Sequence, residues 1–160
     1  MKYFLPVALL VIVSYSCDLL PRKKNPGSHA QARLDLMDAD RTFSKLSEEK
    51  GMKYAFLEYI DSNGVLLRPN QPPIVGADAV DFLIQQNDTT YTLKWEPKDG
   101  FLAQSGELGY TYGIYALMPT SKDTIIYGTY VSIWKKEAGG RWKFVLDTGN
   151  EGIGDRKDDQ

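Results

Sequence analysis

The chain has 160 residues, of which 42% are hydrophobic and 12% aromatic, enough to build the core of one domain. Its 19 basic and 21 acidic residues give a net charge of −2 and form no basic stripe of the kind that binds nucleic acid. The single cysteine and the single histidine exclude an internal disulfide, a histidine-based catalytic triad and a zinc site built from several imidazoles. We therefore expect neither a metal nor a cofactor.

Residues 1–17 have the pattern of an export signal. Lys2 gives a cationic start, an apolar run without charge spans residues 4–13, and Cys17 follows a short polar segment. As a helix this run would be roughly 15 Å long, about half the thickness of a bilayer core, which suits a signal better than a membrane span.

The position of Cys17 is typical of a bacterial lipoprotein signal, in which the cysteine receives lipid and becomes the new N-terminus. Ser14 and Tyr15 depart from the residues usual before such a cysteine, so ordinary secretion with a free thiol, or an uncleaved anchor, stays open. We predict a signal peptide over 1–17 with lipidation of Cys17. The protein would then be extracytoplasmic and anchored to a bacterial membrane, in the periplasm or at the cell surface.

Residues 18–30 are rich in Pro, Lys, Gly and Ser and predict a flexible tether to a domain over residues 31–150. Helical periodicity begins with Leu36, Ala39, Phe43 and Leu46 on one stripe, and a glycine at position 51 is expected to end this helix. Two shorter helices are predicted over 52–60 and 76–86, with a short strand at 65–67 between them.

From residue 91 onward the pattern has a period of two, which is typical of strands. The predicted strands cover 91–97, 101–105, 107–117, 124–136 and 141–147, with turns at 97–100, 119–123 and 138–140. Residues 151–160 predict a disordered tail. Helices followed by an antiparallel meander indicate an α+β fold in which three helices pack on one concave face of a sheet.

Several stretches of the strand region together match a known superfamily. They are LKWEP (93–97), SGELGYTYG (105–113), GTYVSIWK (128–135) and GRWK (140–143). With these motifs, the segment from Asp40 to Asn150 resembles the nuclear-transport-factor-two-like superfamily, in its SnoaL-like bacterial branch of unknown function. The resemblance implies a strongly bent antiparallel sheet wrapped around three N-terminal helices, a cystatin-like cone with a pocket at its wide end. Members include isomerases, hydrolases, dehydratases, ligand binders and dimerisation modules, so the fold does not fix the chemistry.

Two carboxylates are candidates for a site. Asp40 lies within the apolar stripe of the first helix and should face the sheet, either as a general base with a raised pKa or as a structural acid held by Tyr, Trp or backbone donors. Strict alternation places Asp147 opposite Trp142 and Phe144, on the exposed face. A bulge in the last strand would instead turn Asp147 into the pocket beside Asp40.

A set of aromatic residues with polar tips gives the candidate ligand-binding site, consisting of Trp95, Tyr110, Tyr112, Tyr130 and Trp134. Such side chains can grip an apolar ligand with their rings and orient it with O–H or N–H groups. Alternatively, they fill the cone as core.

We favour a lipid-anchored extracytoplasmic binding module that takes a small, partly apolar molecule in an aromatic pocket, without catalysis. The first alternative is an enzyme of the SnoaL or ketosteroid-isomerase type, with Asp40 as base and Tyr or Trp donors that stabilise an enolate. The second is a dimerisation or interaction module that uses an outer sheet face with Ile125, Val131 and Ile133 exposed. The expected partners are the ligand, a membrane contacted through the N-terminal lipid and, in the second alternative, another copy of the chain bound through the outer sheet face.

Overall fold

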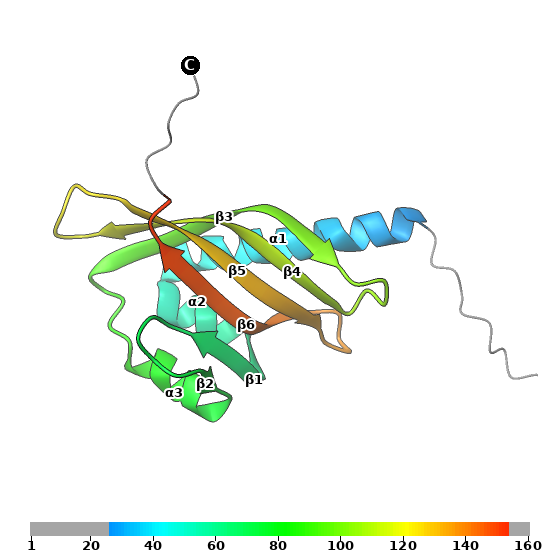
Figure 1. Cartoon of the computed structure of the whole chain (residues 1–160), viewed down its shortest axis with the longest axis horizontal. Coiled ribbons are helices and arrows are strands. Elements are labelled where there is room, and N and C mark those ends of the chain that lie inside the picture. The colour runs from blue at the N-terminus through cyan, green and yellow to red at the C-terminus, as the bar shows by residue number, and fades with distance from the viewer. Residues whose placement is uncertain (1–25, 154–160) are drawn as a thin grey trace, which may run out of the picture.

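The computed structural model of this chain describes residues 26–153. The predicted signal peptide, the lipidation of Cys17, most of the tether and most of the tail lie outside these residues. Three helices and six strands make up the described part (Figure 1). They are α1 (Pro26–Lys50), α2 (Met52–Tyr59), β1 (Ile60–Leu67), β2 (Ile74–Val75), α3 (Ala77–Gln85), β3 (Tyr91–Leu102), β4 (Leu108–Pro119), β5 (Ile126–Lys136) and β6 (Trp142–Glu151).

Helix α1 is longer than predicted, because it begins at Pro26, inside the segment expected to be a flexible tether. Proline suits the first turn of a helix, where its missing N–H would have no partner. The helix ends before Gly51, as the sequence predicts. Gly51 has a φ of +93°, which a residue with a side chain rarely adopts, and it lets α2 start in a new direction.

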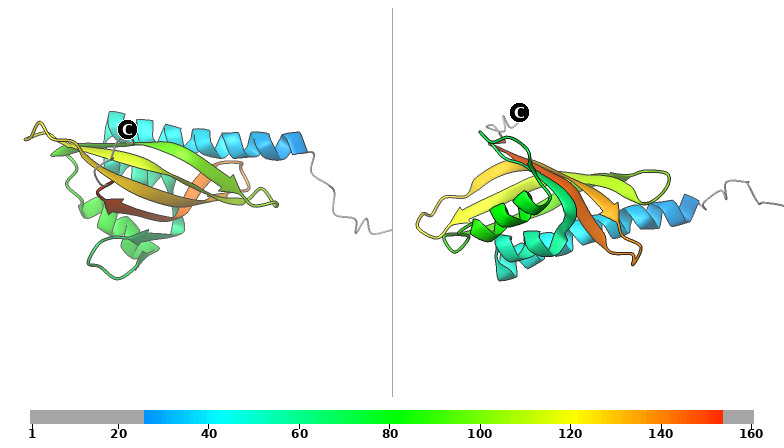
Figure 2. Two further views of the ribbon diagram at one scale, coloured as in Figure 1. Left: turned by 45° about the horizontal axis from the view of Figure 1, so that its top comes forward. Right: turned by 90° about the horizontal axis from the view of Figure 1, so that it is seen from below.

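The six strands form one curled sheet in the order β2-β1-β6-β5-β4-β3. Every neighbouring pair is antiparallel except β1 and β6, so the sheet is mixed and not purely antiparallel as expected. The helices lie on its concave side, with α1 along β3 and with α3 beneath β1 and β2 (Figures 1 and 2). The α+β cone predicted from the sequence is confirmed.

The core fills the space between α1, α2 and the inner face of the sheet. Phe43 of α1 stands at its centre and contacts Trp95 of β3 and Phe56 of α2, with ring centroids 4.5 and 4.8 Å apart. Phe144 and Trp134 complete the cluster from β6 and β5. Burying five such rings supplies much of the hydrophobic stabilisation of a domain of this size.

The predicted turn at residues 97–100 is wrong, because β3 continues through it. The pairing with β4 skips Lys98, which is an extra residue between Pro97 and Asp99 in a β-bulge. β3 is an edge strand, where a proline without N–H costs no ladder hydrogen bond. The chain instead reverses at residues 103–107, between β3 and β4.

Candidate functional site

A bulge in β6 determines which side chains of this strand enter the inside of the cone. The pairing with β5 skips Val145, which becomes an extra residue between Phe144 and Leu146. One extra residue shifts the alternation of side chains by one position. Asp147, paired with Ser132, therefore points inward and is only 7% exposed. Of the two placements that the sequence left open for this carboxylate, the structure has the bulged one, although Asp40 does not line the same cavity.

Arg68 and Asp147 form a partly buried ion pair at the end of β1. The Arg68 Nη2 donates to Asp147 Oδ1 over 2.8 Å, and Nη1 donates to the backbone oxygens of Leu67 and Asp147. The guanidinium also lies over the Phe56 ring, 5.8 Å from its centroid. The second carboxylate oxygen of Asp147 accepts from Ser132 Oγ over 2.8 Å. The parallel pairing of β1 with β6 brings these partners together.

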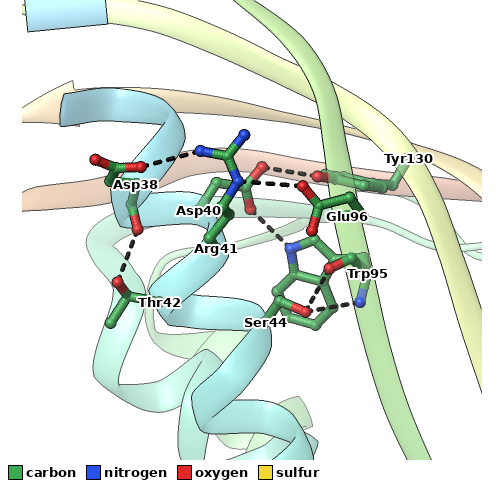
Figure 3. Close-up of polar contacts among 8 residues, drawn as sticks. All are labelled: Asp38, Asp40, Arg41, Thr42, Ser44, Trp95, Glu96 and Tyr130. Carbon is green, nitrogen blue, oxygen red and sulfur yellow. Dashed lines mark hydrogen bonds and ion pairs between the residues drawn. The ribbon is translucent and has the colours of Figure 1, made fainter. Parts of the chain in front are cut away.

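Asp40 lies deeper, with no exposed surface. Its Oδ1 accepts from Trp95 Nε1 and its Oδ2 accepts from the Tyr130 hydroxyl, both over 2.7 Å (Figure 3). Thr111 also donates to this carboxylate, while the Thr111 oxygen accepts from Trp134 Nε1 over 2.8 Å. Burial raises the pKa of Asp40, and the donated hydrogen bonds oppose this effect.

A pocket of about 430 Å³ opens between the helices and the inner face of the sheet. Its wall is formed mainly by aromatic and aliphatic side chains, with a few polar groups. Residues from α2, α3 and four strands contribute, together with the segment after β1. They are Met52, Phe56, Arg68, Pro69, Phe82, Leu83, Gln86, Tyr91, Leu93, Trp95, Tyr115, Leu117, Tyr130, Asp147, Thr148, Gly149 and Glu151. A volume of this size fits a small organic molecule.

The predicted ligand-binding residues divide into three groups. Trp95 and Tyr130 line the pocket. Trp134 does not, because it is completely buried in the aromatic core. Tyr110 and Tyr112 point to the opposite, outer face of the sheet and are 41% and 46% exposed, so they cannot contact a ligand inside the cone. Their alternation on β4 was predicted correctly, but the face was not.

Asp40 is not among the residues that line the pocket, and protein donors occupy both of its oxygens. A general base must reach the proton that it removes, within hydrogen-bond distance or through one water. The geometry is that of a structural acid, the alternative left open for this residue, and it gives no support to Asp40 as a catalytic base.

Sequence reasoning missed Arg68 and Tyr115 as pocket residues. Arg68 reaches the site only through the pairing of β1 with β6, whose partners are about eighty residues apart in the chain. Tyr115 shares a face of β4 with Gly113, where an added Cβ would lie 2.9 Å from the ring of Tyr130, a residue that lines the pocket. A glycine that leaves room for a covering atom marks the inner face, and this signal could have separated Tyr115 from Tyr110 and Tyr112.

Within residues 26–153, no cluster of three or more His, Cys, Asp or Glu side chains is arranged to hold a metal ion. The helices in this part of the chain are also too short or too polar to cross a membrane. The charged residues that line the pocket are the Arg68–Asp147 ion pair and Glu151.

Solved structures with the same arrangement of helices and strands are numerous, although no family model and no curated protein matches the sequence. A ketosteroid isomerase-like protein from Erwinia carotovora atroseptica is 14% identical, with a TM-score of 0.58 over 74% of this chain and 95% of that one. An NTF2-like protein with a cystatin-like fold from Novosphingobium aromaticivorans is 12% identical, with a TM-score of 0.62 over 79% and 86%.

The association domain of CaMKII from Caenorhabditis elegans is 12% identical, with a TM-score of 0.60 over 77% of this chain and 98% of that domain. Identities this low describe a shared fold and say nothing of shared chemistry. The curled mixed sheet around three N-terminal helices is thus the NTF2-like, cystatin-like fold.

Proposed function

We propose that this chain is a lipid-anchored extracytoplasmic binding protein whose pocket takes a small, partly apolar molecule. The observation that carries the binding role is the pocket of about 430 Å³, walled by rings and aliphatic side chains and supplied with a single ion pair. Apolar walls with a few fixed polar groups are typical of small-molecule sites. Asp40 lies outside this pocket and accepts hydrogen bonds from protein donors on both oxygens, which favours binding over catalysis.

The pocket can be tested with N-phenyl-1-naphthylamine, a neutral fluorophore whose emission rises in apolar surroundings. We expect saturable binding to the natural chain. Leu93→Trp, and separately Leu117→Trp, would fill the pocket and weaken binding at least tenfold. Leu108→Trp is the matched control, because Leu108 lies outside the pocket and is 48% exposed. Unsaturable binding, or equal affinity in correctly folded filled variants, would contradict the proposal.

The anchor is supported by the apolar run before Cys17 and is tested separately. When the full chain is expressed in a bacterium fed with labelled palmitate, the label should enter the protein and the protein should sediment with membranes. Cys17→Ser should abolish the labelling. Labelling that persists in this variant, or a natural chain that takes up no label, would refute the anchor without affecting the pocket.

One observation favours a second role as a dimerisation module. Phe101 stacks on Tyr110 with centroids 5.8 Å apart, and Tyr112 follows at 6.4 Å, all on the outer face of the sheet. These rings are 41–56% exposed, whereas Val131 and Ile133, expected to be exposed there, are half-buried beside them. Rings gathered in this way on an open surface suit a contact with a second copy.

Light scattering at several concentrations tests this role. Dimers should form in the natural chain and be lost in Tyr112→Lys. Leu34→Lys, which places the same charge on an exposed apolar position of α1, should leave them intact. A natural chain that stays monomeric at high concentration excludes self-association through this face.

A further inference from the structure

The polar tips of two pocket rings are not available to a ligand. Trp95 Nε1 and the Tyr130 hydroxyl both donate to Asp40, which lies behind the pocket wall (Figure 3). If the buried carboxylate lost either donor, no hydrogen bond would offset the free energy of its desolvation. These bonds therefore persist when the pocket is filled, and the two residues offer a ligand the carbon surface of their rings.

Other aromatic side chains extend this surface around the pocket, namely Phe56, Phe82, Tyr91 and Tyr115. The face of an aromatic ring is electron-rich and attracts cations, most strongly where water is excluded. The Phe56 ring already contacts one cation, the Arg68 guanidinium. Phe82, Tyr91 and Tyr115 line the pocket and are partly exposed, so their rings can receive another cation.

The charged residues that line the pocket also favour a cation. Among the described residues that line it, Arg68 is the only cation, and it is neutralised by Asp147 at 2.8 Å. Glu151 also lines the pocket and has no ion-pair partner within the described part of the chain.

Nearby carboxylates also raise the pKa values of two tyrosines that line the pocket. Burial raises the pKa of the Tyr115 phenol, and the charge of Glu151 raises it further. Burial and the charge of Asp88 likewise raise the pKa of Tyr91, against a smaller opposite effect of Arg68. A cation entering the pocket would be attracted by these carboxylates, whereas an anion would have to displace Asp147 from Arg68.

We propose that the pocket selects ligands that join an apolar body to a cationic group, such as an alkyl or aryl ammonium ion. This inference rests on the proposed binding function and specifies its ligand class. The apolar body would lie against Trp95, Tyr130 and Leu93, and the ammonium group would lie among the ring faces near Glu151.

Three probes with one carbon skeleton test the ligand class: 4-phenylbutylamine, 4-phenylbutanol and 4-phenylbutyrate. They are cationic, neutral and anionic at pH 7, and each displaces the naphthylamine fluorophore if it binds. The amine should bind at least tenfold more tightly than the butyrate, with the alcohol between them. Glu151→Gln should weaken the binding of the amine about threefold, the effect expected of an exposed charge, and leave the affinity for the alcohol unchanged.

Glu107→Gln is the control, because it removes the same charge from the exposed turn before β4, outside the pocket. It should change none of the three affinities. Equal affinities of the amine and the alcohol, or a butyrate that binds most tightly, would overturn the inference, and the second result would make Arg68 the ligand anchor. If none of the three probes nor the fluorophore binds, the proposed binding function itself fails.

Discussion

Replacement of Tyr130 by Phe removes one oxygen atom and tests whether Asp40 has a structural role. The part-buried hydroxyl donates to Asp40 Oδ2 over 2.7 Å. Asp40 itself has no exposed surface, and in a structural role this oxygen only accepts hydrogen bonds. A hydrogen bond to a charged group contributes about 1.5–3 kcal/mol, against about 0.5–1.5 kcal/mol for a neutral one. We expect Tyr130→Phe to lower the free energy of unfolding by about 1.5–3 kcal/mol where Asp40 is ionised.

The loss should depend on pH, and its sign follows from the raised pKa of Asp40. Between its unfolded value of 3.8 and its raised folded value, the folded chain keeps a proton that the unfolded chain has released, so stability falls as the pH rises. The Tyr130 bond lowers this pKa, and its removal raises the pKa further. The destabilisation should therefore be larger at pH 8 than at pH 4, where only a neutral hydrogen bond of about 0.5–1.5 kcal/mol is lost.

Urea unfolding followed by tryptophan fluorescence at pH 4, 6 and 8 measures the loss in the free energy of unfolding and its dependence on pH. In thermal unfolding, the melting temperature should fall by about 6–12 °C at the pH values where Asp40 is ionised, given roughly 4 °C per kcal/mol for a domain of this size. Tyr110→Phe is the control, since its exposed phenol lies on the outer face, and it should change stability by less than about 0.5 kcal/mol. A loss that is absent at every pH, or that is larger at pH 4 than at pH 8, would refute the role assigned to Asp40.

Two further substitutions probe the backbone of the site. Gly113→Ala should destabilise the fold by about 3 kcal/mol or more, because its Cβ would lie 2.1 Å from the backbone oxygen of Glu96, whereas Gly139→Ala meets nothing within 4 Å and should be nearly neutral in the same urea titration. Ser44→Ala should cost about 1–3 kcal/mol in thermal unfolding, since the Ser44 hydroxyl donates to the Trp95 carbonyl over 2.6 Å and accepts from the Trp95 N–H over 2.7 Å, and both backbone groups would lose a buried partner. Ser121→Ala, in an exposed turn, should leave the melting temperature unchanged. A Ser44→Ala variant as stable as this control would contradict the role of Ser44 as the partner of both Trp95 backbone groups.

Local patterns in the sequence determined the order and kind of the main elements. The stripe of Leu36 and Phe43 predicted the helix that faces the sheet, and both side chains are buried. Alternation predicted five strands from residue 91 onward, of which the first two are one strand, β3, and it correctly placed Tyr110 and Tyr112 on one face. These properties depend on neighbours within a few positions along the chain, so the sequence contains the information that fixes them.

Contacts between segments far apart in the chain determine which residues line the pocket. Which face of β4 looks inward is decided by the helices that cover the sheet, so alternation alone could not tell that Tyr115 lines the pocket and Tyr110 does not. Arg68 joins Asp147 only because β1 pairs with β6.

The bulge at Val145 is a single extra residue whose position depends on the register between β5 and β6. It turns Asp147 from the outer face to the inner one. A side-chain period of two lets one residue move every following side chain to the other face, and only tertiary pairing sets that residue. The sequence by itself therefore determined the helices, the strands and the aromatic side chains available to the cone. The tertiary structure decided which of these aromatic side chains face the pocket.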